Sequence, residues 1–278
     1  MDSTIALIGF GEAGSTFATA AGWEGAARAF DVKSKRRAAM IEAGAFVAES
    51  ADDALAGAGL VLSLVTADAA LDAARACAPQ LAQGALFCDM NSVAPETKRA
   101  AAEVVARGAG HYVDVAVLAP VNPARMNVPL LVSGTAADEA AALLRQAGFA
   151  NVRVVGEEVG RASAIKMIRS VMVKGIEALT AEMMLAANAA GVAEEVLASL
   201  EASEKPQSWF ARAAYNIERM VTHGARRAAE MEESAKTLSS LGVEPMMTSG
   251  TVRRQRVQAG SPIETPAKPA AKPEGTVA

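Results

Sequence analysis

Cysteine and histidine are scarce in this chain, which has only two residues of each type among 278. Cys77 and Cys88 form neither a CxxC pair nor a zinc-binding spacing, so we expect no metal site. Cysteines used this sparingly are typical of a reducing compartment, which indicates a cytoplasmic protein. His111 and His223 stand alone in the sequence, and we expect both to be structural.

Long apolar runs and an excess of one charge are also missing. No stretch reaches the ~18 apolar residues of a membrane span, since Lys174, Glu177 and Glu182 interrupt the Ala/Met-rich region. The N-terminus enters a predicted strand without the features of a signal peptide. The net charge of −4 gives no electrostatic reason to bind nucleic acid or anionic lipid. We therefore expect a small-molecule substrate, with neither nucleic acid nor a membrane as partner.

The N-terminal segment Thr4–Ala21 predicts a strand, a glycine-rich turn and a helix, in the order of a dinucleotide site. Gly9 permits the tight turn, Gly11 admits the pyrophosphate, and Gly14 lets the helix pack closely on the strand. The phosphates would meet the free N–H groups at the start of that helix. The residues expected to hold the cofactor here are Gly9, Phe10, Gly11, Glu12, Ala13 and Gly14.

Asp31 distinguishes a cofactor site from an ordinary turn. It ends a second predicted strand, 22 residues after Gly9, where a carboxylate accepts hydrogen bonds from the adenosine ribose. It should repel a 2′-phosphate, so we expect NAD, while nearby basic residues leave NADP open. Those residues are Lys33, Lys35, Arg36 and Arg37.

Strands alternating with helices up to residue 156 predict an α/β fold, a doubly wound parallel sheet of the Rossmann type. From 157 to 258 no strand is expected. This region predicts an all-helical domain that opens with one long helix at Arg161–Ala190 and continues with several shorter helices between Ala193 and Leu241. The segment 259–278 is rich in Pro, Lys and Ala and predicts a disordered tail.

Ligands of such sheets bind where the strands end, which directs attention to the residues just after each strand. Val65, Thr66 and Asn91 follow two apolar strands and are expected beside the cofactor. Ser92 has two interpretations: it caps the helix that begins near Pro95, or it contacts substrate.

Lys166 is the candidate catalytic residue. Its neighbours make the predicted helix apolar nearly all round, which indicates burial, and a buried ammonium is either paired or has a lowered pKa. Such an amine can take a proton from a hydroxyl while hydride leaves the same carbon. An ion pair with an acidic residue of another helix is the alternative. Ser170, one turn along, can reach the same substrate, whereas Lys174, eight residues after Lys166, lies ~12 Å from it along the helix axis.

Arg226 and Arg227 form a second polar cluster beside His223. A helix with this many charges is usually a solvated surface, but either arginine can clamp an anionic substrate or the cofactor if the helical domain covers the cleft.

Together these motifs resemble the β-hydroxyacid dehydrogenase superfamily, the 6-phosphogluconate dehydrogenase-like enzymes. The resemblance extends to about residue 250 and rests on the glycine fingerprint, the Val65-Thr66 turn, the segment 89–95, the strand 112–117, and Gly160 followed by Lys166. It implies that Lys166 is catalytic, that Ser92 contacts substrate, and that the protein is a homodimer formed through its helical domain. The subgroup resembled has a poorly characterised C-terminal helical domain.

Two departures from that family bear on the substrate. Leu118-Ala119-Pro120 replaces the Ser-Gly-Gly turn that commonly receives a substrate carboxylate, and Ser170 replaces an asparagine. A bulkier or less anionic substrate is therefore expected to contact these residues. We expect an NAD(P)-dependent dehydrogenase or reductase acting on CH–OH groups. The alternatives are an imine reductase-like activity, against which Lys166 argues, and a dinucleotide-binding sensor or scaffold without turnover.

Overall fold

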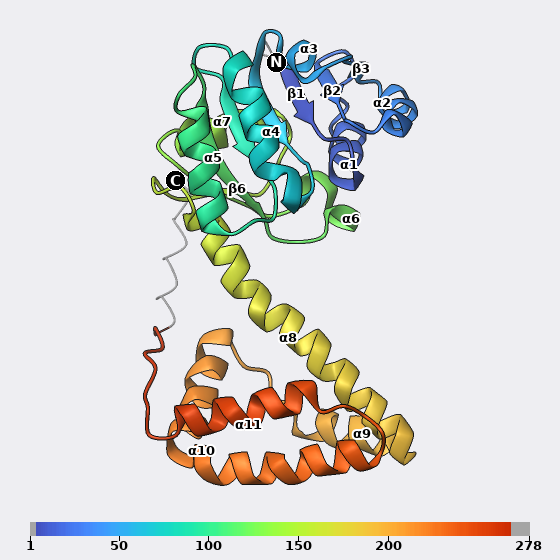
Figure 1. The fold of residues 1–278 in the computed structure, drawn as a ribbon, viewed down its shortest axis with the longest axis vertical. Coiled ribbons are helices and arrows are strands. Elements are labelled where there is room, and N and C mark those ends of the chain that lie inside the picture. Colours follow the sequence, from blue (N-terminus) through green and yellow to red (C-terminus); the bar gives the residue numbers. More distant parts are fainter. Residues whose placement is uncertain (1–3, 268–278) are drawn as a thin grey trace, which may run out of the picture. The chain divides into compact units, whose positions relative to one another are not determined.

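The computed structural model describes residues 4–267 and divides into two compact units, the first ending at Val171 and the second beginning at Met172 (Figure 1). The division falls inside the long helix α8 (Arg161–Ala190), whereas the sequence suggested a domain boundary after residue 156. Most of the expected tail, from residue 268 onward, lies outside the described residues. Its first part, residues 259–267, contains neither helix nor strand.

The first unit contains one eight-stranded sheet with the strand order β3-β2-β1-β4-β5-β6-β7-β8. Its strands are β1 (Thr4–Ile8), β2 (Ala27–Phe30), β3 (Phe46–Val47), β4 (Ala58–Ser63), β5 (Leu86–Asp89), β6 (His111–Val117), β7 (Leu130–Ser133) and β8 (Val152–Gly156). The order reverses between β1 and β4, which places the ligand crevice of a doubly wound sheet at the ends of these two strands.

The Rossmann-type α/β fold is confirmed, but the sheet is not wholly parallel. β7 runs antiparallel to β6, with Val115 opposite Val132, and every other pairing is parallel. The reason lies in the connection. Only the four-residue helix α6 (Val121–Ala124) and a short 3-10 turn separate the two strands, and a parallel crossover normally needs a longer helix.

Helices cover both faces of the sheet. One face packs against α1 (Glu12–Ala21), α2 (Arg37–Glu42) and α7 (Ala137–Gln146), and the other against α3 (Ala51–Leu55), α4 (Ala70–Cys77) and α5 (Pro95–Val105). Alternate residues of each strand point into two hydrophobic cores, the first core on the α1 face and the second on the α4 face. In β5, for example, Leu86 and Cys88 lie in the first core and Phe87 lies in the second. This alternation directs Asp89 towards α5.

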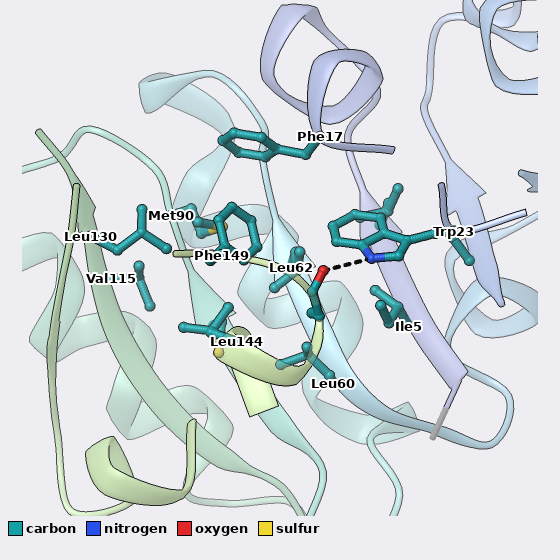
Figure 2. Packing of buried hydrophobic residues seen from close by; sticks show 14 of the residues in the cluster. Ile5, Phe17, Trp23, Leu60, Leu62, Met90, Val115, Leu130, Leu144 and Phe149 are labelled. Atoms are coloured by element: carbon teal, nitrogen blue, oxygen red, sulfur yellow. Dashed lines mark hydrogen bonds between the residues drawn. The ribbon is translucent and has the colours of Figure 1, made fainter. Parts of the chain in front are cut away.

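Aromatic side chains fill the end of the first core (Figure 2). Phe17 meets Phe149 edge to face, with ring centroids 5.0 Å apart. The buried indole of Trp23 donates a hydrogen bond to Ala147 O at 2.9 Å, which satisfies its only polar atom. These contacts fix α1 and the end of α7 on the same face of the sheet.

The second unit is helical throughout its described part. It comprises the rest of α8, then α9 (Ala193–Ser203), α10 (Trp209–Ser240) and α11 (Met246–Gln258). The bounds of α8 match the prediction, but the expected series of shorter helices after it is wrong, because α10 is one helix of 32 residues. α11 packs on α10 at Gly224, where an added Cβ would lie 2.4 Å from Gln255 O.

No helix within residues 4–267 is long and apolar enough to cross a membrane.

Candidate functional site

The glycine-rich turn between β1 and α1 has the geometry that its sequence predicts. Gly9 has a φ of +96°, and a Cβ there would lie 2.6 Å from Leu64 O. A Cβ on Gly14 would lie 2.7 Å from Gly9 O, so the close packing of α1 on the turn requires glycine. At Gly11, by contrast, no described atom lies within 4 Å of an added Cβ. Backbone N–H groups at the start of α1 are therefore open to a phosphate, and the residues present fit a dinucleotide.

A cavity of about 560 Å³ opens beside this turn. It lies over the ends of β1, β2 and β4, at the reversal of strand order. Its wall includes Gly9, Gly11, Glu12, Ala13, Phe30, Asp31, Val32, Lys33, Arg36, Leu64, Val65 and Thr66. Most of the residues predicted to hold the cofactor are thus brought together. Phe10, Gly14 and Asn91 are not among its lining residues. The Phe10 side chain is fully buried in the core of the first unit, and only its backbone belongs to the turn.

Asp31 has partners that the sequence did not reveal. Its Oδ2 accepts a hydrogen bond from Phe10 N at 2.8 Å, and its Oδ1 accepts one from Lys33 N at 2.8 Å. The carboxylate therefore braces the glycine-rich turn. Each oxygen retains a lone pair for a ribose hydroxyl.

A second cavity, of about 360 Å³, adjoins the first. The two share Glu12, Ala13, Leu64 and Val65 in their walls, so they lie side by side along the sheet edge. The remaining lining residues of the second cavity are Ala67, Met90, Asn91, Ser92, Val117, Ala119, Pro120, Val121 and Lys166. The strand-end turns predicted from sequence meet here, including the turn at residues 117–121, together with Met90, which was not predicted as a site residue.

Lys166 and Ser92 are in direct contact. The Lys166 Nζ donates a hydrogen bond to Ser92 Oγ at 2.5 Å. Ser92 does not cap α5, whose N-cap residue is Ala94, and of the two interpretations the structure therefore disfavours capping. An amine, a hydroxyl and the open wall of a cavity lie together, which is an arrangement suited to proton transfer.

The expected burial of Lys166 is wrong within this chain, because its side chain is half-buried. Only the first turn of α8 packs tightly on the first unit, through Ala162 and Ser163. As the helix leaves the sheet its apolar side chains become exposed, Ile168 and Val171 by about three quarters.

The other predicted substrate contacts have mixed outcomes. Ser170 Oγ donates to Lys166 O at 2.9 Å along the helix, and Ser170 does not line the second cavity. Leu118 also lies outside the lining, and its carbonyl accepts from Arg169 Nη1 at 3.2 Å. Ala119 and Pro120 are lining residues, as expected.

Arg226 and Arg227 belong to the second unit. Arg226 pairs with Glu230 one turn along the exposed face of α10, which matches the solvated-surface interpretation. Arg227 is half-buried, and its Nε has no hydrogen-bond partner among the described residues.

A buried polar network below the second cavity was missed by the sequence analysis. Lys98 of α5 is fully buried between Asp89 of β5 and Asp114 of β6. Tyr112 donates to Asp89 Oδ2 at 2.7 Å, and burial, together with the charge of Asp89, raises the pKa of the Tyr112 hydroxyl above its usual range. The signal available in the sequence was an aspartate inside the apolar run Val113-Asp114-Val115, since a buried charge needs a partner.

Two family models match the chain. The NAD binding domain of 6-phosphogluconate dehydrogenase matches residues 4–156, and a domain of unknown function, DUF1932, matches residues 187–257. The α/β unit and the helical unit thus each correspond to a family model.

Solved structures are similar over nearly the whole chain. A conserved hypothetical protein from Sinorhizobium meliloti 1021 is 40% identical, with coverage of 92% of this chain and 88% of that chain and a TM-score of 0.62. The conserved protein MTH1747, whose structure is described as similar to 3-hydroxyacid dehydrogenases, is 30% identical, with coverage of 92% and 98% and a TM-score of 0.61.

An imine reductase from Myxococcus stipitatus in complex with NADP+ shares the fold, with a TM-score of 0.76, 19% identity and coverage of 91% and 93%. At that identity the likeness concerns the fold alone.

The glycine-rich turn, the cavity at the strand reversal and the family match agree. The chain belongs to the family defined by the NAD binding domain of 6-phosphogluconate dehydrogenase, with a DUF1932 domain after it.

Proposed function

We propose that this protein is an NAD(P)-dependent oxidoreductase that transfers hydride between the nicotinamide and a hydroxyl or carbonyl carbon, with Lys166 as the proton-transfer residue. The carrying observation is the Lys166–Ser92 contact in a cavity that shares its wall with the cavity beside the glycine-rich turn. A dinucleotide whose phosphates lie at α1 would extend along the shared wall towards this pair.

The chain's own residues divide the chemistry between them. The bound nicotinamide supplies or accepts the hydride. Lys166 Nζ exchanges a proton with the substrate oxygen, which balances the charge as the carbon is oxidised or reduced. Ser92 Oγ accepts a hydrogen bond from the amine and so holds it in the cavity. When substrate binds, the Ser92 hydroxyl can instead form a hydrogen bond with the substrate.

NAD is the proposed cofactor, since the Asp31 carboxylate lies in the wall of the larger cavity and would repel a 2′-phosphate. Lys33 and Arg36 line the same cavity, and their positive charges weaken the preference for NAD over NADP. Titration with NADH and NADPH, followed by protein fluorescence, decides between them. Tighter binding of NADPH would reverse the assignment.

The substrate is proposed to be bulkier or less anionic than a short hydroxy acid. Ala119 and Pro120 present no hydroxyl or side-chain donor to a carboxylate where they line the cavity, and the Glu12 carboxylate shares that wall. Imines belong in the screen because an imine reductase shares the fold.

A homodimer formed through the helical domain is proposed as the working assembly. The exposed apolar side chains along α8 support it, because a long apolar stripe on a helix normally packs against another surface. These side chains are Ile165, Ile168, Val171, Met172, Val173, Ile176 and Leu179. Sedimentation velocity should give twice the monomer mass of 28.5 kDa. A monomer at micromolar concentration would overturn this assembly.

The decisive experiment compares Lys166→Ala with Lys174→Ala, an exposed lysine two turns along α8. Hydroxy acids, aryl alcohols, ketones and imines are screened for a cofactor-dependent absorbance change at 340 nm. Lys166→Ala should keep its affinity for NADH and lose at least ~100-fold in turnover, the lower range of acid–base catalysis, while Lys174→Ala stays active. Near-normal turnover in Lys166→Ala would overturn the mechanism. Cofactor binding with no turnover by the wild type would favour a sensor or scaffold.

A further inference from the structure

The fully buried Lys98 links the two elements that carry Ser92 and Lys166. Its Nζ lies 3.0 Å from Asp89 Oδ1 and 3.4 Å from Asp114 Oδ1, and it donates to Asp89 O at 2.6 Å. Two carboxylates and one ammonium leave a net charge of −1 in an interior from which water is excluded. Such an ion cluster is seldom worth more to stability than apolar residues of the same volume.

The first branch of this cluster reaches Ser92. Asp89 Oδ1 accepts hydrogen bonds from Asn91 N at 2.9 Å and from Asn91 Nδ2 at 2.7 Å. Asn91 Nδ2 also donates to Ser63 Oγ at 3.0 Å, which anchors the turn to β4. The backbone that presents Ser92 to the cavity is therefore fixed one residue before it.

The second branch reaches Lys166. Asp114 Oδ2 accepts from Gly160 N at 3.1 Å, from Ser163 N at 3.0 Å and from Ser163 Oγ at 3.1 Å. A carboxylate from β6 thus caps the start of α8, where the helix dipole favours a negative charge. Lys166 follows Ser163 by three residues and lies on the same side of the helix.

We propose that Lys98 is a positioning residue: by holding Asp89 and Asp114 together it sets the distance between Ser92 Oγ and Lys166 Nζ. The inference rests on the proposed function for its catalytic meaning. The positioning itself does not depend on the substrate. Both branches begin at the Lys98 ammonium, and they end at the two members of one hydrogen-bonded pair, Ser92 and Lys166.

The test measures the reactivity of the Lys166 amine, so no substrate is required. Full-length protein is treated briefly with acetic anhydride, and mass spectrometry gives the acetylation of Lys166 relative to Lys205, an exposed lysine of the second unit. Ser92→Ala removes the partner directly and sets the scale of the effect. Lys98→Met and Asp114→Asn should each raise the ratio about fivefold, the change expected when one ordinary hydrogen bond is lost.

Leu144→Ala is the matched control for lost stability, since Leu144 is fully buried in the core on the opposite face of the sheet. It should lower the melting temperature without moving the acetylation ratio. If Lys98→Met fails to fold, Asp114→Asn and the double variant Lys98→Met/Asp114→Asn, which keeps the net charge of the cluster, decide the matter. An unchanged ratio in any folded variant that separates Lys98 from Asp114 overturns the proposal. Failure of the proposed function appears elsewhere, in the turnover of Lys166→Ala.

Discussion

Lys166 Nζ and Ser92 Oγ lie 2.5 Å apart although 74 residues separate them in the chain. The contact joins the first turns of α8 to the turn after β5, in the wall of the smaller cavity. A serine hydroxyl that accepts from an ammonium limits where the amine can point, so the pair is a preorganised unit rather than two independent side chains.

Ser92→Ala should reduce turnover about tenfold on the best substrate of the screen, since a hydrogen bond to a charged group is worth roughly 1.5 kcal/mol. Ser92→Thr, which keeps the hydroxyl, is the matched control and should retain most of the activity. Steady-state kinetics and NADH titration are the measurements. A loss of NADH affinity equal to the loss of turnover would assign Ser92 to cofactor binding instead.

The glycines of the turn predict opposite outcomes for one added methyl group. In Gly11→Ala the new Cβ meets no described atom within 4 Å, so thermal stability should stay within ~0.5 kcal/mol of wild type. The methyl would nevertheless occupy the approach of the pyrophosphate and weaken NADH binding about tenfold or more. Gly14→Ala should destabilise the fold by ~1–3 kcal/mol, because its Cβ would lie 2.7 Å from Gly9 O. Urea unfolding measures the stability of the two variants, and NADH titration measures their cofactor affinity. Equal stability of Gly11→Ala and Gly14→Ala would contradict the prediction.

Local patterns were sufficient to predict α8 but not α10. The run from Arg161 to Ala190 lies between Gly160 and Gly191, both with positive φ, and its bounds match the prediction. α10 contains Gly224, a poor helix former, yet continues through it. The glycine is needed there for the approach of α11, a tertiary contact that no local pattern reveals.

The candidate site shows the same limit. Residues after strands could be predicted because parallel strands end at one edge of a sheet, and Asn91, Ser92 and Ala119 do line the smaller cavity. The hydrogen bond that Lys166 donates to Ser92 and the burial of Lys98 between Asp89 and Asp114 depend on long-range packing. The sequence also overestimated the burial of Lys166. An apolar helix periodicity indicates that a surface is covered, but it does not say whether the cover comes from the same chain or from a separate molecule.

Neither cysteine should react with a thiol reagent in the folded protein. Burial raises the pKa of Cys77 and of Cys88 to about 12, aided by the charges of Asp52 and Asp89 respectively, and both side chains are fully buried. At pH 8 Ellman's reagent should therefore detect no thiol before unfolding and two afterwards. Cys77 lies in the wall of the larger cavity. If one thiol reacts rapidly in the folded protein and NADH suppresses that reaction, the prediction is wrong and the cavity wall at Cys77 opens in solution.

Glu182 of α8 caps the start of α11 within the second unit. Its carboxylate accepts from Met247 N at 2.7 Å, Thr248 N at 2.8 Å and Thr248 Oγ1 at 2.6 Å. Burial alone would raise its pKa, but these hydrogen bonds outweigh burial and hold the pKa below the ordinary value of 4.5. Glu182→Gln should therefore cost ~1–2 kcal/mol of unfolding free energy at pH 7, as expected for a lost cap.

The pH dependence gives this prediction its sign. A carboxylate whose pKa is lowered by folding contributes its full stabilisation above pH 4.5 and loses it as the pH falls through the lower folded-state value, where the folded protein must also bind the proton. The difference in urea midpoint between wild type and Glu182→Gln should thus be constant near neutrality and shrink in acid. Glu177→Gln, an exposed change on the same helix, should show neither effect. A difference that stays constant down to pH 3 would mean that the charge of Glu182 contributes nothing to the cap.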